Sequence, residues 1–460
     1  MADRSAAVSG DQPFVQLSGW GRTAPTPAVL TPVRGEDDAR AVLAHRSPRG
    51  VLPRGLARSY GDAAQNAGGH VLDMTGADRV LDADLAAGEI EVEAGISLDR
   101  LMALFVPQGW FVPVTPGTRY VTVGGAIAAD IHGKNHHRVG SFAQHVRWLD
   151  LLTADGTVRR VGPDQDPELY WATAGGMGLT GVILRARIRM TAIESARLVV
   201  DTDRTPDLDS LMTLLTETDH HYDYSVAWID CLARGRRMGR SVLTRGRFAR
   251  AEELPDRLRD DPLRYSGTVR LSAPDVFPSG LLNRATVAAF NEVWFRKAPR
   301  RRRDQIQGIP AFFHPLDGVG EWNRIYGRRG FVQYQFVVPF GQEAALRHAM
   351  LRISSSGTAS FLAVLKRFGE GNLGLLSFPA PGWSLALDIP VGDAGLAGLL
   401  DGLDELVAGA GGRIYLAKDS RARPELLERM YPGLERFRAV RQRVDPQGVF
   451  ASDLARRLSL

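Results

Sequence analysis

The chain has 460 residues, of which 44% are hydrophobic and 24% are charged, and its formal net charge is +5. These values are ordinary for a globular protein with two or three domains and a sizeable core. No stretch is apolar enough to span a bilayer, and the single cysteine, Cys231, excludes an internal disulfide and a cysteine-rich metal site.

Helices and strands alternate through the first part of the chain. Residues 1–15 lack the apolar core of a secretory signal, and we expect them to be disordered. Between 16 and 193, periodicity predicts a helix over 37–45, strands over 50–53 and 89–93, and a helix over 98–105. A hairpin of 148–154 and 157–161 around Asp155-Gly156 is predicted next, followed by a helix over 168–173 and a strand over 182–188.

Longer strands separated by amphipathic helices are predicted between residues 194 and 412. The strands are expected over 199–201, 224–229, 241–244, 332–338, 361–365 and 385–389, and the helices over 211–216, 343–353 and 396–408. An antiparallel sheet backed by helices is the simplest arrangement, so the expected fold class is α+β. A third segment, 413–460, is predicted to hold a strand over 413–417 and arginine-rich helices over 424–442.

Two glycine-bearing loops suggest a site for a long anionic ligand. The segment 115–140 places Gly124 and Gly125 before a small apolar run that suits a short helix, and an upstream loop spans 54–62. Glycine lets the backbone approach a ligand closely, and the N–H groups at a helix start attract phosphate. Two such loops would hold a dinucleotide from two sides. The alternative is that these glycines only form turns.

A third glycine cluster, 176–181, matches the pattern G-x-G-x-x-G. The nicotinamide-binding fingerprint requires a strand before the glycines and a helix after them. Here the predicted helix precedes the cluster and the predicted strand follows it. A Rossmann site is therefore not expected.

The densest positive charge lies in residues 296–303, RKAPRRRR, and Arg328-Arg329 follows. One interpretation is a solvated, mobile loop. The functional interpretation that we prefer is contact with an anionic lipid surface, where each Lys or Arg contributes roughly 1 kcal/mol of attraction. No nucleic-acid-binding signature accompanies the run, so we expect no nucleic-acid partner.

Several motifs occur in one order along nearly the whole chain. They are GWGRTAP at 19–25, ARSYGDAAQN at 57–66, TVGGAIAADIHGKNHH at 122–137, DLLTADG at 150–156, GEWNRIYG at 320–327, VQYQF at 332–336, LSFPAPGW at 376–383, AKDSR at 417–421 and VDPQGVFASDLARRL at 444–458. In these motifs the chain resembles the vanillyl-alcohol oxidase superfamily of FAD enzymes, and most closely an actinobacterial branch of it. The resemblance implies a two-domain fold, with an FAD-binding domain made of 16–193 and the C-terminal return 413–460, and an antiparallel-sheet substrate domain, 194–412, inserted between them.

The resemblance also implies FAD as the cofactor, with most of its contacts in the two glycine loops. The implied contacts are Pro53, Arg54, Gly55, Leu56, Ala57, Arg58, Ser59, Tyr60, Gly61, Asp62, Ala63, Gly117, Thr118, Thr122, Val123, Gly124, Gly125, Ala129, Asp130, Ile131, His132, Ile183 and Tyr415. Many members of the superfamily attach FAD covalently through a histidine in the first loop. Tyr60 stands at that place here, so we expect FAD to be held noncovalently.

Oxidising a secondary alcohol with a flavin requires a group that removes the hydroxyl proton and a positive charge beside the flavin. Lys418 is the candidate for the charge and for the base, and the alternative is a surface lysine paired with Asp419. His132 is the rival base, with the alternative of fixing the cofactor loop by hydrogen bonds. The adjacent residues His136 and His137 are weak evidence for a metal site, and no metal is expected.

The resemblance places substrate contacts on a set of polar residues and one alanine: Lys134, Gln333, Gln335, Lys366, Ser384, Ala386 and Lys418. Amides suit sugar hydroxyls, and lysines suit a phosphodiester. Gln333 and Gln335 alternate along a predicted strand, so both project from one face. Related mycobacterial chains carry a cysteine where this sequence has Ala386, which changes the wall of the pocket.

The implied reaction is oxidation of the ribose 2-hydroxyl of a polyprenylphosphoryl-ribose to the 2-keto compound, as the first half of an epimerisation that supplies arabinose for the cell wall. A separate NAD(P)H-dependent keto-reductase would complete it. Trp228, Phe313 and Trp322 are candidates for an apolar path for the polyprenyl tail, or for ordinary core. We expect peripheral membrane association at the cell envelope, on a side that the sequence leaves open. The alternatives are an oxygen-using sugar or alditol oxidase of the same superfamily and a noncatalytic flavin- or lipid-binding protein.

Overall fold

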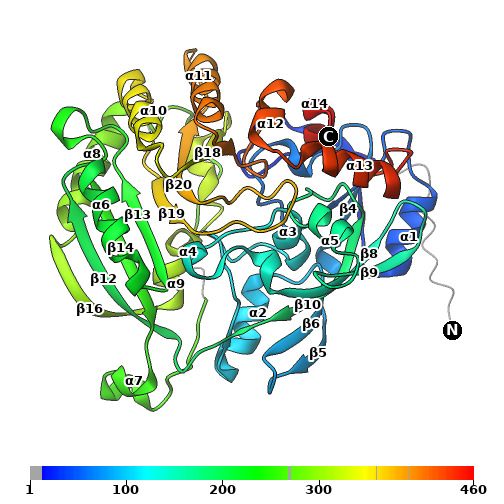
Figure 1. Cartoon of the computed structure of the whole chain (residues 1–460), viewed down its shortest axis with the longest axis horizontal. Helices are drawn as coiled ribbons and strands as arrows, with labels where there is room; N and C mark the ends of the chain where they lie inside the picture. The colour runs from blue at the N-terminus through cyan, green and yellow to red at the C-terminus, as the bar shows by residue number, and fades with distance from the viewer. Residues whose placement is uncertain (1–12, 268–270, 359, 393) are drawn as a thin grey trace.

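The computed structural model describes residues 13–267, 271–358, 360–392 and 394–460. Figure 1 shows two halves built around separate sheets, with the C-terminal helices, in red, lying against the N-terminal half. Of the stretch 1–15 that was expected to be disordered, 1–12 lie outside the described residues. The expectation is wrong for Phe14 and Val15, because they pair with Val29 and Ala28 at a sheet edge.

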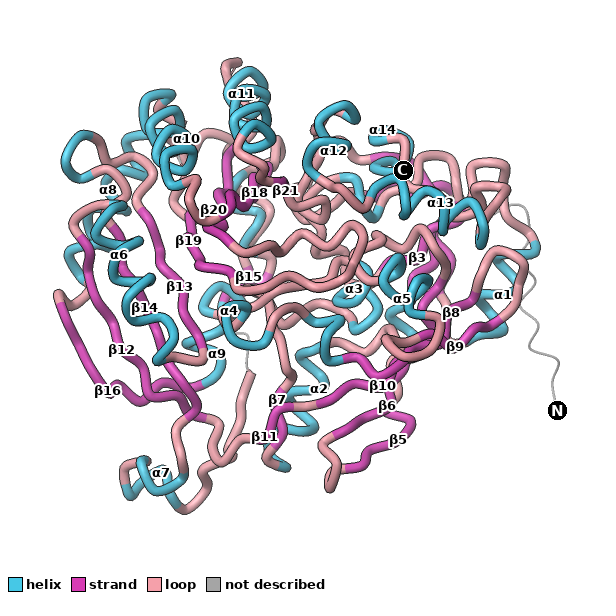
Figure 2. Tube along the Cα trace, in the orientation of Figure 1, coloured by secondary structure: helices cyan, strands magenta, loops and turns pink. Residues whose placement is uncertain are grey.

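The first half is formed by two main sheets (Figure 2). One has the order β1 (Phe14–Leu17), β2 (Thr26–Pro32), β4 (His70–Asp73) and β3 (Val51–Arg54), and α1 (Glu36–Ala44) packs beside it. The other is antiparallel, with the order β5 (Val80–Asp84), β6 (Glu89–Glu93), β10 (Val182–Arg189), β8 (Val146–Leu152) and β9 (Val158–Val161). The remaining elements are α2 (Leu98–Phe105), α3 (Val123–Ala128), α4 (His136–Val139), α5 (Pro167–Thr173) and the strand pair β7 (Trp110–Phe111) and β11 (Thr191–Ala192).

Local signals explain why these elements begin and end where they do. Helix α2 starts after Ser97, whose side chain accepts a hydrogen bond from the Arg100 N–H at 3.1 Å. Its apolar residues recur at helical spacing and are buried. The hairpin of β8 and β9 turns at Gly156, which has a φ of 80°, a conformation that glycine adopts without steric cost.

The second half is an eight-stranded sheet with one face covered by helices. Its order is β16 (Arg301–Gly308), β12 (Arg197–Thr205), β14 (Ser241–Phe248), β13 (Tyr224–Ile229), β19 (Ala363–Phe368), β20 (Gly382–Pro390), β18 (Phe331–Pro339) and β21 (Arg413–Ile414), and its neighbours pair antiparallel. Helices α6 (Leu208–Thr218), α10 (Glu343–Ser356) and α11 (Leu396–Gly409) pack on one face. Outside the sheet lie α7 (Asp256–Arg259), α8 (Arg284–Lys297), α9 (Ile309–Phe313) and the short pair β15 (Leu271–Ser272) and β17 (Val319–Gly320). The α+β class with an antiparallel second sheet is confirmed.

The structure corrects one interpretation in this half. The basic run is not a mobile loop, because Arg296 and Lys297 end α8 and Arg301 begins β16, an edge strand paired with β12. The single cysteine, Cys231, lies just beyond the end of β13 and is fully buried.

The C-terminal segment returns to the first half slightly later than predicted. Strand β21 still extends the second sheet by pairing with β18. Helices α12 (Pro424–Met430), α13 (Leu434–Val444) and α14 (Asp453–Leu458) then follow, and α13 packs against α5. No helix within the described part of the chain has the length and apolar character needed to cross a membrane.

Candidate active site

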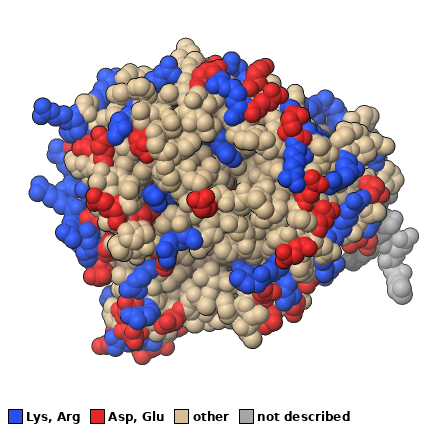
Figure 3. Space-filling model, in the orientation of Figure 1, with Lys and Arg blue, Asp and Glu red and all other residues tan. Residues whose placement is uncertain are grey.

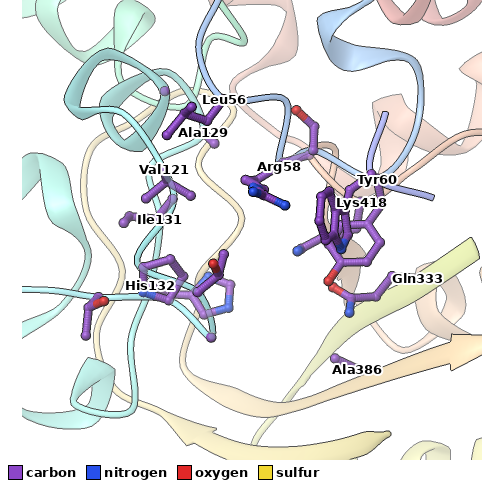
Figure 4. A pocket seen from close by; sticks show the side chains of 18 of the residues that line it. Leu56, Arg58, Tyr60, Val121, Ala129, Ile131, His132, Gln333, Ala386 and Lys418 are labelled. Carbon is purple, nitrogen blue, oxygen red and sulfur yellow. The ribbon is translucent and has the colours of Figure 1, made fainter. Parts of the chain in front are cut away.

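A cavity of about 650 Å³ lies between the two halves and is lined by both glycine loops and by the second sheet. Such a volume is typical of small-molecule and cofactor sites. Figure 4 shows Tyr60, Lys418 and Gln333 on one side of it and Val121, Ile131 and His132 on the other. The sheet contributes one face, opposite to the face that the helices cover, because side chains alternate along each strand.

The first glycine loop follows β3 and is held close to the second. A side chain at Gly55 would place its Cβ 2.2 Å from Thr122 Oγ1, so only glycine permits this approach. Ala57 has a φ of 55°, a strained conformation of the kind that collects at functional loops. The Arg58 guanidinium stacks on Trp20, 3.7 Å from the ring centroid.

The second glycine loop leads into α3 as predicted. Thr122 caps this helix, because its hydroxyl accepts a hydrogen bond from the Gly125 N–H at 3.2 Å. Gly124 packs against Ala94, where an added Cβ would lie 3.1 Å from the alanine Cβ. Gly117 lines the cavity, and an added Cβ there would meet no protein atom within 4 Å.

Two residues of the cavity wall hold polar atoms that lack a hydrogen-bond partner in the described part of the chain. Nε of Arg58 and Nδ1 of His132 are buried and have no hydrogen-bond partner among the described residues. Both residues line the cavity. A buried donor without a partner is costly, and a bound ligand with acceptor oxygens or nitrogens removes that cost. The two loops and these two donors fit a dinucleotide such as FAD.

Three lysines converge on the sheet side of the cavity. Lys134 donates to the Phe312 carbonyl, and its Nζ lies 4.6 Å from the centroid of the Phe312 ring. Burial, with the nearby positive charge of Lys366, lowers the pKa of Lys134 to about 7. Burial alone lowers the pKa of Lys366 to about 8. Lys418 is the third.

Lys418 belongs to a buried network that the sequence did not predict. Its Nζ lies 3.8 Å from the centroid of the Tyr60 ring. Asp388, the cross-strand partner of Gln333, accepts a hydrogen bond from the Gln333 amide and is completely buried. Burial lowers the pKa of Lys418, an effect that the Asp388 charge opposes, and burial raises the pKa of Asp388. The two pKa values therefore move towards each other.

Asp419 is not the partner of Lys418. Its carboxylate lies 2.9 Å from Arg457, and Arg457 also contacts Asp62 at 2.8 Å. This ion triad joins the first glycine loop, the turn that carries Lys418 and helix α14. The interpretation of Lys418 as a surface lysine paired with Asp419 is therefore wrong.

His132 is buried on the opposite wall, among Phe368, Phe378 and Tyr415. Gln335 Nε2 lies 2.9 Å from His132 Nε2, so the amide donates and the imidazole accepts. Burial, with the positive charge of Lys366, holds the pKa of His132 well below its ordinary value. The ring is thus neutral and its free nitrogen carries the proton.

Some predicted contact residues do not line the cavity. Gly61 packs on the Asp419 carbonyl, Asp62 pairs with Arg457, and Val123 is buried in the core. Asp130 is buried and accepts hydrogen bonds from Ser141, Ser377, Asn372 and the Ala143 N–H. Ser384 faces the cavity side of the sheet but lies behind Gln335, whose amide donates to it at 3.2 Å. The other predicted cofactor and substrate residues line the cavity, as do Trp228, Phe313 and Trp322.

The adjacent histidines are engaged elsewhere. His136 Nδ1 accepts from the Gly369 N–H at 3.2 Å, and His137 Nε2 lies 2.9 Å from the Tyr222 carbonyl. Within the described part of the chain, no group of three or more potential metal ligands comes together.

Sequence reasoning missed Asp388 and much of the apolar wall. Asp388 interrupts a run of apolar residues in the predicted strand 385–389, and this lone carboxylate was the available signal. The apolar residues Val226, Val242, Leu362 and Val364, which line the cavity, gave no signal because strand residues of this kind are usually core.

Comparisons with known proteins agree with this geometry. A family profile described as an FAD binding domain matches residues 27–162, and one described as D-arabinono-1,4-lactone oxidase matches residues 398–458. Decaprenylphosphoryl-β-D-ribose oxidase of Mycolicibacterium smegmatis is 48% identical, over 97% of each chain. An uncharacterised protein in the mprA 5′ region of Streptomyces coelicolor is 47% identical, over 79% of this chain and 100% of its own. Cytokinin dehydrogenase 5 of Oryza sativa subsp. japonica is 30% identical over 37% of this chain and 35% of its own.

The fold and the cavity, with the match to an FAD binding domain, define an FAD-dependent oxidoreductase of the vanillyl-alcohol oxidase type. Within that class, the chain belongs to the family of decaprenylphosphoryl-β-D-ribose oxidases.

Proposed function

We propose that this protein oxidises the ribose 2-hydroxyl of decaprenylphosphoryl-β-D-ribose to the 2-keto compound, using noncovalently bound FAD. The observation that carries the proposal is the 48% identity to the Mycolicibacterium smegmatis oxidase along nearly the full length of both chains. The cavity supports it, because it continues from the glycine loops past three lysines to an apolar end.

FAD, when bound, would accept the hydride from C2 of the ribose. Lys418 is the group that takes the hydroxyl proton, because burial lowers its pKa and so provides a neutral amine near neutral pH. Once protonated, its Nζ is stabilised by the Tyr60 ring and by the charge of Asp388. His132 is a weaker candidate base, because its accepting nitrogen is already occupied by Gln335.

Lys134 and Lys366 are the contacts proposed for the phosphodiester. Both are half-buried in the cavity wall and have lowered pKa values, so an arriving anion would restore their charge and bind tightly in surroundings of low dielectric constant. Gln333 and Gln335 project into the cavity from one face of β18 and suit the sugar hydroxyls. Ala386, their neighbour on β20, provides a small apolar wall.

Two further parts of the proposal concern partners. A separate NAD(P)H-dependent keto-reductase would reduce the 2-keto product to the arabinose epimer. The glycine cluster 176–181 of this chain follows helix α5 and precedes strand β10, the reverse of the order in a nicotinamide site. The protein would also contact anionic membrane lipid, because its substrate carries a polyprenyl chain that resides in the bilayer.

The cofactor part is tested by acid precipitation. Tyr60 occupies the place of the tethering histidine. Its phenol ring, which contacts Lys418 and Phe331, has no imidazole nitrogen to form that link. FAD should remain in the supernatant after the protein is precipitated. Flavin that stays with the washed pellet would show a covalent link.

The reaction is tested by anaerobic mixing with decaprenylphosphoryl-ribose while the flavin absorbance is followed. The proposal predicts bleaching by this substrate and recovery with an artificial electron acceptor. Bleaching by free sugars or alditols, but not by the lipid-linked ribose, would contradict it. Oxygen consumption equal to turnover would favour the alternative of an oxygen-using oxidase.

A further inference from the structure

The apolar end of the cavity reaches the protein surface at helix α8. Trp294 lines the cavity and is also 45% exposed to solvent. From Lys366 back along the chain towards Phe361, Val364 and Leu362 line the cavity. The Phe361 ring contacts Phe290 of α8, with ring centroids 5.6 Å apart. A long hydrocarbon chain that starts near the lysines would therefore leave the protein beside α8.

The outer side of α8 carries large apolar residues that are partly exposed to solvent. Phe290, Val293 and Trp294 are 42%, 66% and 45% exposed, and the rings of Phe290 and Trp294 stack with centroids 5.9 Å apart. They share one side of the helix, because residues three and four apart are neighbours on its surface. The inner side is fixed by buried Val287 and Asn291, and Asn291 donates to Asp230 at 2.8 Å.

Positively charged residues follow the apolar residues along the chain, at the end of α8 and the start of β16. Lys297, Arg300, Arg301 and Arg302 are exposed, and among the described residues none of them has a carboxylate within ion-pair distance. Arg296 and Arg303 differ, because they pair with Glu292 at 2.5 Å and with Asp203 at 2.8 Å. Figure 3 shows Lys and Arg side chains projecting from the left edge of the molecule, the edge where α8 and β16 lie in Figure 1.

We propose that this docking surface (Phe290, Val293, Trp294, Lys297, Arg300, Arg301 and Arg302) binds an anionic lipid bilayer, and that a polyprenyl tail passes from the bilayer into the cavity beside Trp294. Interfacial helices bind membranes by combining inserted apolar side chains with cations that attract anionic headgroups, and this surface supplies both. A second copy of the chain is a poorer occupant, because a two-fold contact would place these unpaired cations against one another. The passage of the tail rests on the proposed function, but the binding of lipid does not.

The test is sedimentation of the FAD-loaded protein with vesicles made of equal parts phosphatidylcholine and phosphatidylglycerol, and with vesicles of phosphatidylcholine alone. Wild-type protein should sediment with the anionic vesicles and be released by salt. Val293→Asp should weaken that binding about tenfold, and Arg301→Ser/Arg302→Ser should do so by a similar factor, because each removes one of the two contributions. Leu104→Asp on α2, where Leu104 is 42% exposed, is the matched control and should bind as wild type does.

Activity separates this proposal from the proposed function. With a short-chain, water-soluble analogue of the substrate, Val293→Asp should reduce its flavin at the wild-type rate. With the full lipid in anionic vesicles it should be slower. Failure of every variant, wild type included, to reduce flavin would contradict the proposed function while leaving vesicle binding intact. The proposed docking surface is contradicted if Val293→Asp and the double serine variant both bind vesicles as wild type does, or if Leu104→Asp loses as much binding as they do. It is also contradicted if wild type is a dimer and Val293→Asp is a monomer, because the surface would then bind a second copy of the chain.

Discussion

Lys418 is the residue on which the proposed chemistry depends most, because its amine takes the proton. It is half-buried, its Nζ lies 3.8 Å from the centroid of the Tyr60 ring, and the charge of Asp388 raises its pKa. Lys418→Met keeps much of the side-chain volume but removes the proton acceptor and the charge. We expect FAD binding to persist and flavin reduction by substrate to slow by about 100-fold or more, as when one preorganised polar contact is lost.

Rapid-mixing absorbance measurements at saturating substrate give this rate directly. The matched control is Lys297→Met, the same change at an exposed lysine outside the cavity. Because Lys297 belongs to the docking surface, both variants are compared with the short-chain, water-soluble substrate analogue. A Lys418→Met protein that reduces its flavin at the control rate would remove Lys418 from the mechanism and favour His132.

The carboxyl of Asp388 should tune Lys418 without touching the substrate, so we regard it as a positioning residue. The Asp388 charge raises the pKa of Lys418 against the lowering effect of burial. Asp388→Asn removes that charge, so the pKa of Lys418 falls further. If neutral Lys418 is the base, the rate of flavin reduction rises with pH through the pKa of Lys418, and this rise should move to lower pH in the variant.

A pH profile of the flavin-reduction rate tests this prediction, and a purely structural role for Asp388 would not produce the shift. Gln333→Met serves as the control, because Gln333 contacts Asp388 but carries no charge. A profile that keeps its midpoint in Asp388→Asn, with a uniformly lower rate, would assign Asp388 to packing alone.

At the scale of elements, most of the helices and strands could be predicted from the sequence because their periodicity and their turn residues give a strong signal. Helix α2 has the predicted bounds, and the hairpin around Asp155-Gly156 forms as expected. Gln333 and Gln335 do line the cavity from one face of β18, which follows from strand geometry alone.

Long-range contacts explain the elements that could not be predicted. The run around Arg301 lacks apolar alternation, and it becomes strand β16 because β12 offers it a pairing edge. Strand β21 stops at Ile414, since the chain then turns to place Lys418, with the Lys418 N–H donating to the Tyr415 carbonyl at 2.9 Å. The pairing of Asp388 with Gln333 depends on strand register, which neither local sequence reveals.

The ion triad of Asp62, Arg457 and Asp419 should hold three separate segments in place. Arg457→Ala would leave the largely buried Asp419 carboxylate without its partner. We expect the free energy of unfolding to fall by about 2 kcal/mol and FAD to be held less tightly, because the first glycine loop and the Lys418 turn lose a common anchor.

Urea unfolding of the FAD-free protein and titration with FAD measure the two effects separately. Arg436→Ala, which removes an exposed ion pair with Glu168, is the control and should be nearly neutral. Unchanged stability and unchanged FAD affinity in Arg457→Ala would show that the triad is incidental.

At the scale of the whole molecule, each half supplies different residues of the cavity. The first half supplies the glycine loops, the second sheet supplies Gln333, Gln335 and Lys366, and the C-terminal return carries Lys418 to the junction. The apolar wall of the second half then leads to α8. This arrangement accounts for a substrate with a sugar, a phosphodiester and a long lipid tail, each met by a different part of the cavity.

The central claim is that the hydrogen at C2 of the ribose leaves as hydride in the step that reduces the flavin. Decaprenylphosphoryl-ribose with deuterium at C2 tests it most directly, in anaerobic rapid mixing with the FAD-loaded protein. We predict that bleaching slows several-fold relative to the unlabelled substrate and that the product carries a ketone at C2 with the deuterium lost. Bleaching at the same rate with both substrates, together with deuterium retained at C2 of the product, would contradict the account.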